Sequence, residues 1–397
     1  MDRLSRKIGI ALVVLALASV YSLCAFTDSV TAAGQSESPA LLFTVRSSQS
    51  SSMVSTLLIE SPSLIRQLLR AKEEPSEDGV LIPDLEVSLR HGKRESSYRL
   101  ERSGKLWNPL TSAKLVLSKQ TSRRLLKYAD ALRNKHYGQL IPWEQARNIV
   151  TRKSAFTITD LESGLSFRVQ RRAGSSHADV QPLTKVDSAI MKRIYDGKWS
   201  WDRKAIVVQK DSLRIAASMN GMPHGGDGIP DNGFSGHFCV HFLDSTSHRS
   251  VIPDPDHQLM VYKAAGNLRA YFESSPPLAL AERFIEALNR KDEILIRQIW
   301  DDPPNNKFKA FIQALGPYQS ISVPQKWKKK FARTLQEESK TRLTTDIGLP
   351  IRILANGRTS RNDELHLVFK RNSFNAAWKI EDVFIIPAKE DHSSLMP

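Results

Sequence analysis

The segment MNGMPHGGDGIPDNGFSGHFCVHF (219–242) joins a glycine-rich loop to a short apolar run that is typical of a strand. His237 and Cys239 are two positions apart in this run. Because side chains alternate along a strand, both are expected on the same face. A histidine in that place can take the thiol proton, and the thiolate is the reactive form of cysteine. The segment therefore predicts a nucleophilic cysteine, Cys239, with His237 as its general base.

The glycines of this segment favour close approach of the backbone to a substrate. Gly236 directly precedes His237. We expect its amide, or that of Cys239, to hold the substrate carbonyl together with His224, as an oxyanion hole does. Further residues are expected to line the same cleft, either as substrate-binding groups or as structural ones: Gly225, His241, His177 and Asp179.

The first residues have the pattern of an export signal. Three basic residues precede an uncharged apolar run over 8–26, and small residues follow. This pattern predicts a signal peptide or signal anchor over 1–33, and hence a location at the extracytoplasmic face of the membrane or in the cell wall. The second cysteine of the chain, Cys24, lies in that segment. After cleavage Cys239 has no partner for an intramolecular disulfide, so its thiol is reactive, intermolecular or a buried apolar group.

The formal net charge of +15 indicates anionic surroundings. For an exported chain these are anionic cell-wall polymers or the membrane surface. The sequence contains no nucleic-acid-binding motif, so nucleic acid is not expected as a partner.

Patterning along the chain predicts an α+β multidomain protein. A Ser-rich linker over 34–52, with room for a short strand at Leu41–Arg46, is expected to precede a small α+β domain of unknown role over 53–150. A β-rich catalytic domain is expected over 151–272. The last region, 276–397, has helical periodicity first and strand-like alternation afterwards. That order resembles the nuclear transport factor 2-like (NTF2-like) α+β cone.

The cysteine segment also resembles a family, the L,D-transpeptidases of the YkuD type. His224-Gly225 corresponds to their His-Gly element, and a slightly shorter gap separates it from His237, Cys239 and the apolar Val240. The chain departs from the family pattern at three positions. This chain has Gly236 where the family has Ser or Thr, Phe238 where it has Gly, and His241 where it commonly has Arg.

The resemblance implies a small β-rich catalytic domain that needs no cofactor. It implies that Cys239 attacks a peptidoglycan stem peptide and forms a thioester. The acyl group then passes to an amine or to water.

Two alternatives remain open at this point. One is a zinc-dependent cell-wall peptidase that uses His177, Asp179, His224 and His237, since zinc takes imidazole and carboxylate ligands. The other is a non-catalytic envelope-binding protein, in which Cys239 is simply buried.

Overall fold

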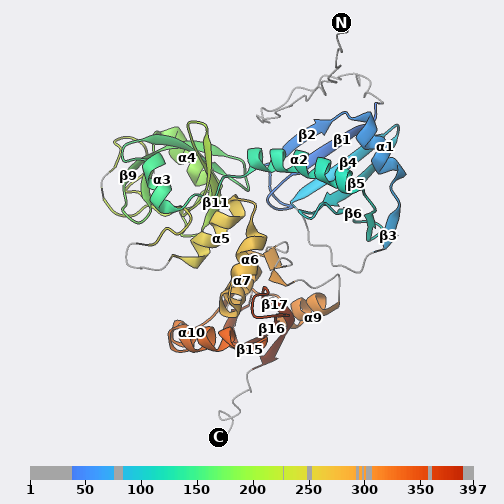
Figure 1. Ribbon diagram of the computed structural model, residues 1–397. Coiled ribbons are helices and arrows are strands. Elements are labelled where there is room, and N and C mark those ends of the chain that lie inside the picture. Colours follow the sequence, from blue (N-terminus) through green and yellow to red (C-terminus); the bar gives the residue numbers. More distant parts are fainter. Residues whose placement is uncertain are drawn as a thin grey trace. The chain divides into compact units, whose positions relative to one another are not determined.

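The computed structural model describes residues 38–75, 84–226, 228–247, 253–291, 295–296, 299–300, 306–355 and 360–387 (Figure 1). The predicted signal segment, 1–33, lies outside these ranges. The described chain divides into two compact units. The first contains the described residues up to Asp254 together with 264–266, and the second contains 255–263 and the residues from Asn267 onward. Both units are mixed α+β, which confirms the predicted class at that level.

A seven-stranded sheet forms the start of the first unit. Its strand order is β2-β1-β4-β5-β6-β7-β3. The strands are β1 (Ala40–Val45), β2 (Ser55–Ile59), β3 (Glu73–Pro75), β4 (Leu85–His91), β5 (Arg94–Leu100), β6 (Leu106–Asn108) and β7 (Ala113–Leu115), and the helices are α1 (Pro62–Arg70) and α2 (Lys119–His136). Helix α2 packs against β1 and β2, because its apolar face is made of regularly spaced residues such as Leu125, Ala129 and Leu132.

The described part of the predicted linker, 38–52, contains a strand close to the one expected at Leu41–Arg46. Strand β1 lies inside the sheet, between β2 and β4, and its residues Leu41, Phe43 and Val45 are fully buried. The serines that suggested flexibility are also bonded, since the Ser48 hydroxyl donates to the Glu162 carboxylate at 2.6 Å. The alternating apolar residues decide the local structure here, and the serines satisfy their hydroxyls within the unit.

A closed barrel of six strands follows in the same unit, in the order β10-β13-β12-β11-β8-β9. Its strands are β8 (Ala155–Asp160), β9 (Ser166–Ala173), β10 (Ala178–Pro182), β11 (Lys204–Lys210), β12 (Leu213–Met219) and β13 (Phe238–His241), accompanied by helices α3 (Trp143–Ile149) and α4 (Lys185–Ile194). Helix α4 starts with a capping box, in which Thr184 and Asp187 satisfy each other's backbone amides. The barrel agrees with the strand pattern of this region, and the catalytic role and the bounds 151–272 stay predictions.

Strand β13 alternates between the barrel core and the outer side of the wall. Phe238 and Val240 are fully buried in the core cluster. The Phe238 ring contacts Phe167 and Phe234, at centroid distances of 6.2 and 5.8 Å. The Phe238 side chain, at the position where the L,D-transpeptidase pattern has Gly, therefore packs in the core and points away from the face that carries Cys239.

The second unit consists of helices around a four-stranded sheet of order β14-β15-β16-β17. The elements are α5 (Pro255–Ala264), α6 (Leu268–Ser274), α7 (Pro277–Arg290), α9 (Asn306–Leu315), β14 (Ser320–Ser322), α10 (Gln325–Lys340), β15 (Thr344–Leu354), β16 (Ser360–Lys370) and β17 (Lys379–Pro387). Helices precede the long antiparallel strands, as expected, although short β14 comes before α10. The NTF2-like identity stays a prediction. Within the described ranges, no helix combines the length and apolarity that a membrane crossing requires.

Replacing Phe238 with alanine tests the structural role of this ring. We expect Phe238→Ala to lower the free energy of unfolding by about 3–5 kcal/mol, because it leaves a cavity in a fully packed core. Denaturant titration followed by circular dichroism measures the effect. Leu110→Ala is the control, since Leu110 is 91% exposed and its loss should change stability by no more than about 0.5 kcal/mol. Equal effects of the two substitutions would contradict the assignment of Phe238 to the core.

Candidate active site around Cys239

Two neighbouring strands bring a group of ionisable side chains together on the outer side of the barrel wall. Strands β10 and β13 are antiparallel, and Asp179 is the register partner of Cys239. Their neighbours Ala178, Val180, Phe238 and Val240 belong to the barrel core. Because successive side chains alternate, Asp179 and Cys239 point the other way. His177 and His241, two residues away on each chain, follow the same alternation.

A backbone bridge adds a third segment to this group. His224 and His237 exchange two backbone hydrogen bonds, of 2.9 and 2.8 Å, which clamps the glycine-rich loop onto the chain entering β13. The His224 imidazole then reaches the thiol, with its Nε2 3.2 Å from Cys239 Sγ. Its Nδ1 donates to the carbonyl of Met222 at 2.8 Å. Since a carbonyl accepts only, the ring proton sits on Nδ1 and Nε2 is left to accept the thiol proton.

Gly225 and Gly236 make this bridge sterically feasible. Their φ values are +68° and +92°, in the left-handed region that glycine tolerates. A Cβ on Gly225 would overlap the His237 ring, and a Cβ on Gly236 would overlap the His224 carbonyl. Both glycines therefore have a structural role. Gly225 is also exposed, so its predicted contact with substrate stays open.

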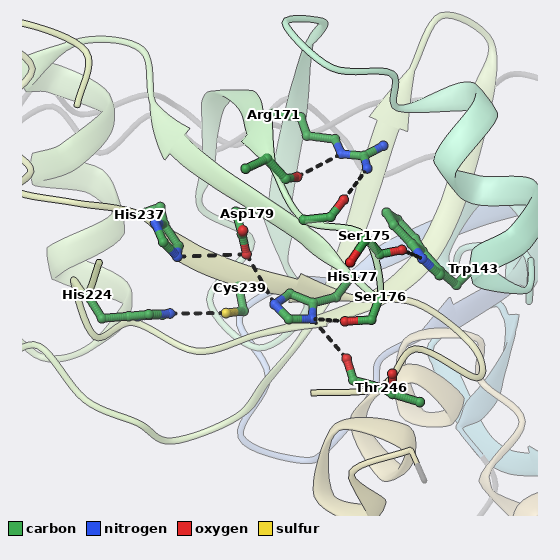
Figure 2. Close-up of polar contacts among 12 residues, drawn as sticks. Trp143, Arg171, Ser175, Ser176, His177, Asp179, His224, His237, Cys239 and Thr246 are labelled. Atoms are coloured by element: carbon green, nitrogen blue, oxygen red, sulfur yellow. Dashed lines mark hydrogen bonds and ion pairs between the residues drawn. The ribbon is translucent and has the colours of Figure 1, made fainter. Parts of the chain in front are cut away.

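Asp179 lies between two histidines (Figure 2). Its Oδ1 is 3.1 Å from His177 Nε2 and 3.8 Å from His237 Nε2. The side chains of His177 and Asp179 are only 1% and 6% exposed, whereas that of His237 is 16% exposed. Cys239 is buried as well, at 5% exposure, so burial does not separate it from His177, Asp179 and His241. Substrate contact by these three residues stays a prediction.

Figure 2 shows His224 and His177 on either side of Cys239. Burial raises the pKa of the Cys239 thiol, but hydrogen bonds from His177 and His224 outweigh it, so the net pKa is lowered. The pKa of His224 is raised, chiefly by its bond to Cys239. Burial lowers the pKa of His177, yet the Asp179 carboxylate and the thiolate raise it to about 10. These directions favour a thiolate between two imidazolium rings.

Arg171 and Trp143 fix the segment that leads into His177. The guanidinium of Arg171, itself buried, donates to the carbonyls of Ala173 and Gly174 at 3.1 and 2.6 Å. It also lies 4.8 Å from the centroid of the Trp143 ring. The Trp143 indole N–H donates to the carbonyl of Ser175 at 2.8 Å. The backbone before His177 is thus held at successive residues, which limits the freedom of the imidazole.

One group of potential metal ligands occurs among the described residues: His177, Cys239 and His241, whose ligand atoms lie within 4.8 Å of one another. The ligand set predicted for the zinc alternative was a different one, which included His224 and His237. In addition, the rings of His177 and His241 stack, with centroids 4.5 Å apart and planes 11° from parallel. A metal ion lies in the plane of each imidazole that binds it, and two stacked planes do not share such a point. As the rings lie, the two histidines cannot ligate one ion, and we assign no metal centre.

The positions of the two histidines near Cys239 bear on the roles expected from the sequence. His237 was expected to be the base and His224 to hold the substrate carbonyl. The His224 Nε2 is the nitrogen at 3.2 Å from Sγ, and the His237 Nε2 lies near Asp179 instead. The prediction that His237 and Cys239 lie on one face agrees with the alternation of β13, but the loop supplies the closer imidazole.

Trp201 is a candidate residue that sequence reasoning missed. Its side chain is 50% exposed, and its ring centroid lies 5.0 Å from that of His224. An exposed aromatic surface therefore borders the imidazole. The only signal in the sequence is the pair of tryptophans in KWSW (198–201). On a strand, the alternation of Trp199 and Trp201 would place both rings on one face, but the segment is not a strand in the structure.

Comparisons with known proteins provide no relative for this chain, since no family model, no curated protein and no solved structure matches it. The candidate site therefore has to be judged by its own geometry.

Substituting Gly236 tests the loop clamp. Gly236→Ala should destabilise the first unit by about 1–3 kcal/mol, because it forces a side chain into a left-handed backbone and onto the His224 carbonyl. It should also slow alkylation of Cys239 near neutral pH, since His224 is displaced. Thermal unfolding and thiol alkylation measure the two effects. Gly226→Ala is the matched control, because a methyl group at Gly226 would meet no atom within 4 Å and the backbone there is not left-handed. Similar losses in both variants would contradict the clamp.

Proposed function

We propose that this protein is an exported cysteine acyltransferase or hydrolase of the L,D-transpeptidase type that acts on peptidoglycan stem peptides. The observation that carries the proposal is the hydrogen-bonded series Cys239 Sγ, His224 Nε2, His224 Nδ1–H and Met222 carbonyl, with distances of 3.2 and 2.8 Å. Nucleophile, base and orienting group are the parts that covalent catalysis requires. We assign the base to His224 in place of His237.

The first half of the reaction forms the thioester. The Cys239 proton passes to His224 Nε2, and the thiolate attacks the carbonyl carbon of a peptide bond. The tetrahedral intermediate collapses when the carbon–nitrogen bond breaks. His224 gives its proton to the leaving amine nitrogen, so the imidazole is neutral again when the thioester is complete.

The second half releases the acyl group. An incoming amine or water loses a proton to His224 Nε2 while it attacks the thioester carbon. The sulfur leaves as thiolate, and the Cys239–His224 pair returns to its starting state. The acceptor decides between cross-linking and hydrolysis, and both use the same two side chains.

The envelope location and substrate class rest on different observations. The basic, apolar and small-residue pattern at the N-terminus supports export. The net charge of +15 supports retention near anionic wall polymers or membrane headgroups. The His-Gly and His-x-Cys elements supply the likeness to enzymes that act on stem peptides. The exposed ring of Trp201 beside His224 provides an apolar surface for a substrate chain.

The test is turnover of isolated peptidoglycan fragments carrying tetrapeptide or pentapeptide stems, with and without a free amino-acid acceptor. Wild-type protein should give exchanged or trimmed stems, and intact-mass measurement should detect an acyl adduct on Cys239. Cys239→Ala should lose both. His224→Gln should lower the turnover rate roughly 100- to 10,000-fold, because it removes the proton carrier.

Two results would contradict the proposal. One is full activity of Cys239→Ala, which would move the chemistry elsewhere. The other is activity that a chelator abolishes and zinc restores, which would favour a metallopeptidase. Arg90→Gln is a suitable control variant, because Arg90 lies on the exposed part of β4 and forms a half-exposed ion pair with Glu95. It should keep wild-type turnover.

A further inference from the structure

We propose that His177 is a fixed buried cation that, paired with Asp179, holds Cys239 as a thiolate, so that His224 is reserved for moving protons. The inference deepens the proposed cysteine chemistry and rests on it. It gives a function to a buried histidine that lies far before the cysteine in the sequence.

The groups around His177 favour protons on both ring nitrogens. Its Nδ1 lies 2.8 Å from the carbonyl oxygen of Thr246, which only accepts. Its Nε2 lies 3.1 Å from an oxygen of the Asp179 carboxylate, which is also a hydrogen-bond acceptor. The ring interacts with Cys239 through a side-chain hydrogen bond as well. A neutral imidazole has one N–H and would turn a lone pair toward one of these acceptors. The imidazolium satisfies both, and the side chain is 1% exposed, so water does not compete.

The charges around the thiol fit this assignment. Asp179 provides the anion that pairs with His177, and His237 approaches the same carboxylate oxygen from its partly exposed side. The ring of His241 stacks on the face of His177 and leaves the edge with its N–H groups to the acceptors. His224 is hydrogen-bonded to the sulfur. The buried guanidinium of Arg171 interacts electrostatically with Asp179.

A division of labour between the two histidines follows. If His224 alone stabilised the free thiolate, the thiol would regain its proton whenever His224 lost its own proton to solvent. In the thioester the sulfur carries no charge, so His224 is neutral there and accepts the proton of the incoming amine or water. With His177 supplying a constant positive charge, His224 can lose and regain its proton while the sulfur stays anionic until it bonds to carbon. His177 acts on the charge of the nucleophile, and His224 acts on the protons of the substrates.

The experiment is the rate of Cys239 alkylation by iodoacetamide from about pH 4 to about pH 11, in the full chain without its signal segment. Wild-type protein should reach its plateau below the ordinary thiol pKa of about 8.5. His177→Gln should move the midpoint upward by at least about one pH unit, which lowers the rate near neutral pH roughly tenfold or more, and should rejoin the wild-type rate at high pH. His224→Gln should keep a midpoint below about 8.5 while losing turnover, because His177 remains.

The matched control is His136→Gln, which removes a buried imidazole of the same unit, in α2. It should leave the alkylation midpoint unchanged. An unchanged midpoint in folded His177→Gln would overturn the proposal. So would a rate reduced by the same factor at every pH, because that result would mean altered access rather than altered charge.

Nitrogen-15 spectra of histidine-labelled wild-type protein test the same point without any substitution. At about pH 8, where an ordinary histidine is neutral, His177 should retain protons on both ring nitrogens. A single N–H there would overturn the proposal, even if His177→Gln fails to fold. Neither measurement uses a substrate. If the alkylation midpoint and the two ring protons of His177 are as expected but peptidoglycan is not turned over, only the proposed function is contradicted. If the protein turns over peptidoglycan but lacks both of these properties, only the role of His177 is contradicted.

Discussion

The antiparallel pairing of β10 with β13 is the constraint on which the candidate site depends. The register that sets Asp179 opposite Cys239 also sets Ala178 opposite Val240 and Val180 opposite Phe238. A shift by one residue would turn Phe238 and Val240 out of the core and turn the thiol into it. Burial of those apolar side chains therefore holds the register, and the register holds the nucleophile beside its carboxylate. The stability of the barrel and the alignment of the reactive groups have one physical origin.

The buried ionisable groups are stable only as a set. An isolated charge in such a place costs several kcal/mol of desolvation, and burial alone would keep the thiol protonated and both imidazoles neutral. Each group offsets the cost for its neighbours: Asp179 for His177, and both histidines for Cys239. Removing one member leaves the others with uncompensated charge, so single substitutions should change several protonation states together.

Part of this arrangement could be predicted from the sequence. The alternation in FCVH predicted a strand with the thiol on one face and apolar groups on the other, and the glycine pattern marked the loop that brings His224 close. The choice between His224 and His237 as base could not be predicted, because it depends on a backbone bridge between two loop residues. The burial of His177 and Asp179 also depends on which strands become neighbours, and local patterns carry no information on that. The contacts of the serines after β1 could not be predicted either, because a serine that donates to Glu162 looks, in sequence, like a serine exposed to water.

The alternation of β13 has a consequence for how this chain tolerates change. Phe238 and Val240 pack in the barrel core, whereas Cys239 and His241 contact the groups outside it. No side chain of the strand does both. The outward-facing side chains of β13 can consequently be changed without altering the apolar side chains that pack in the core. Substitutions that keep Phe238 and Val240 preserve the register of the strand, so a library that varies only Cys239, His241 and Asp179, the register partner of Cys239, would explore new reactivity on an unchanged scaffold.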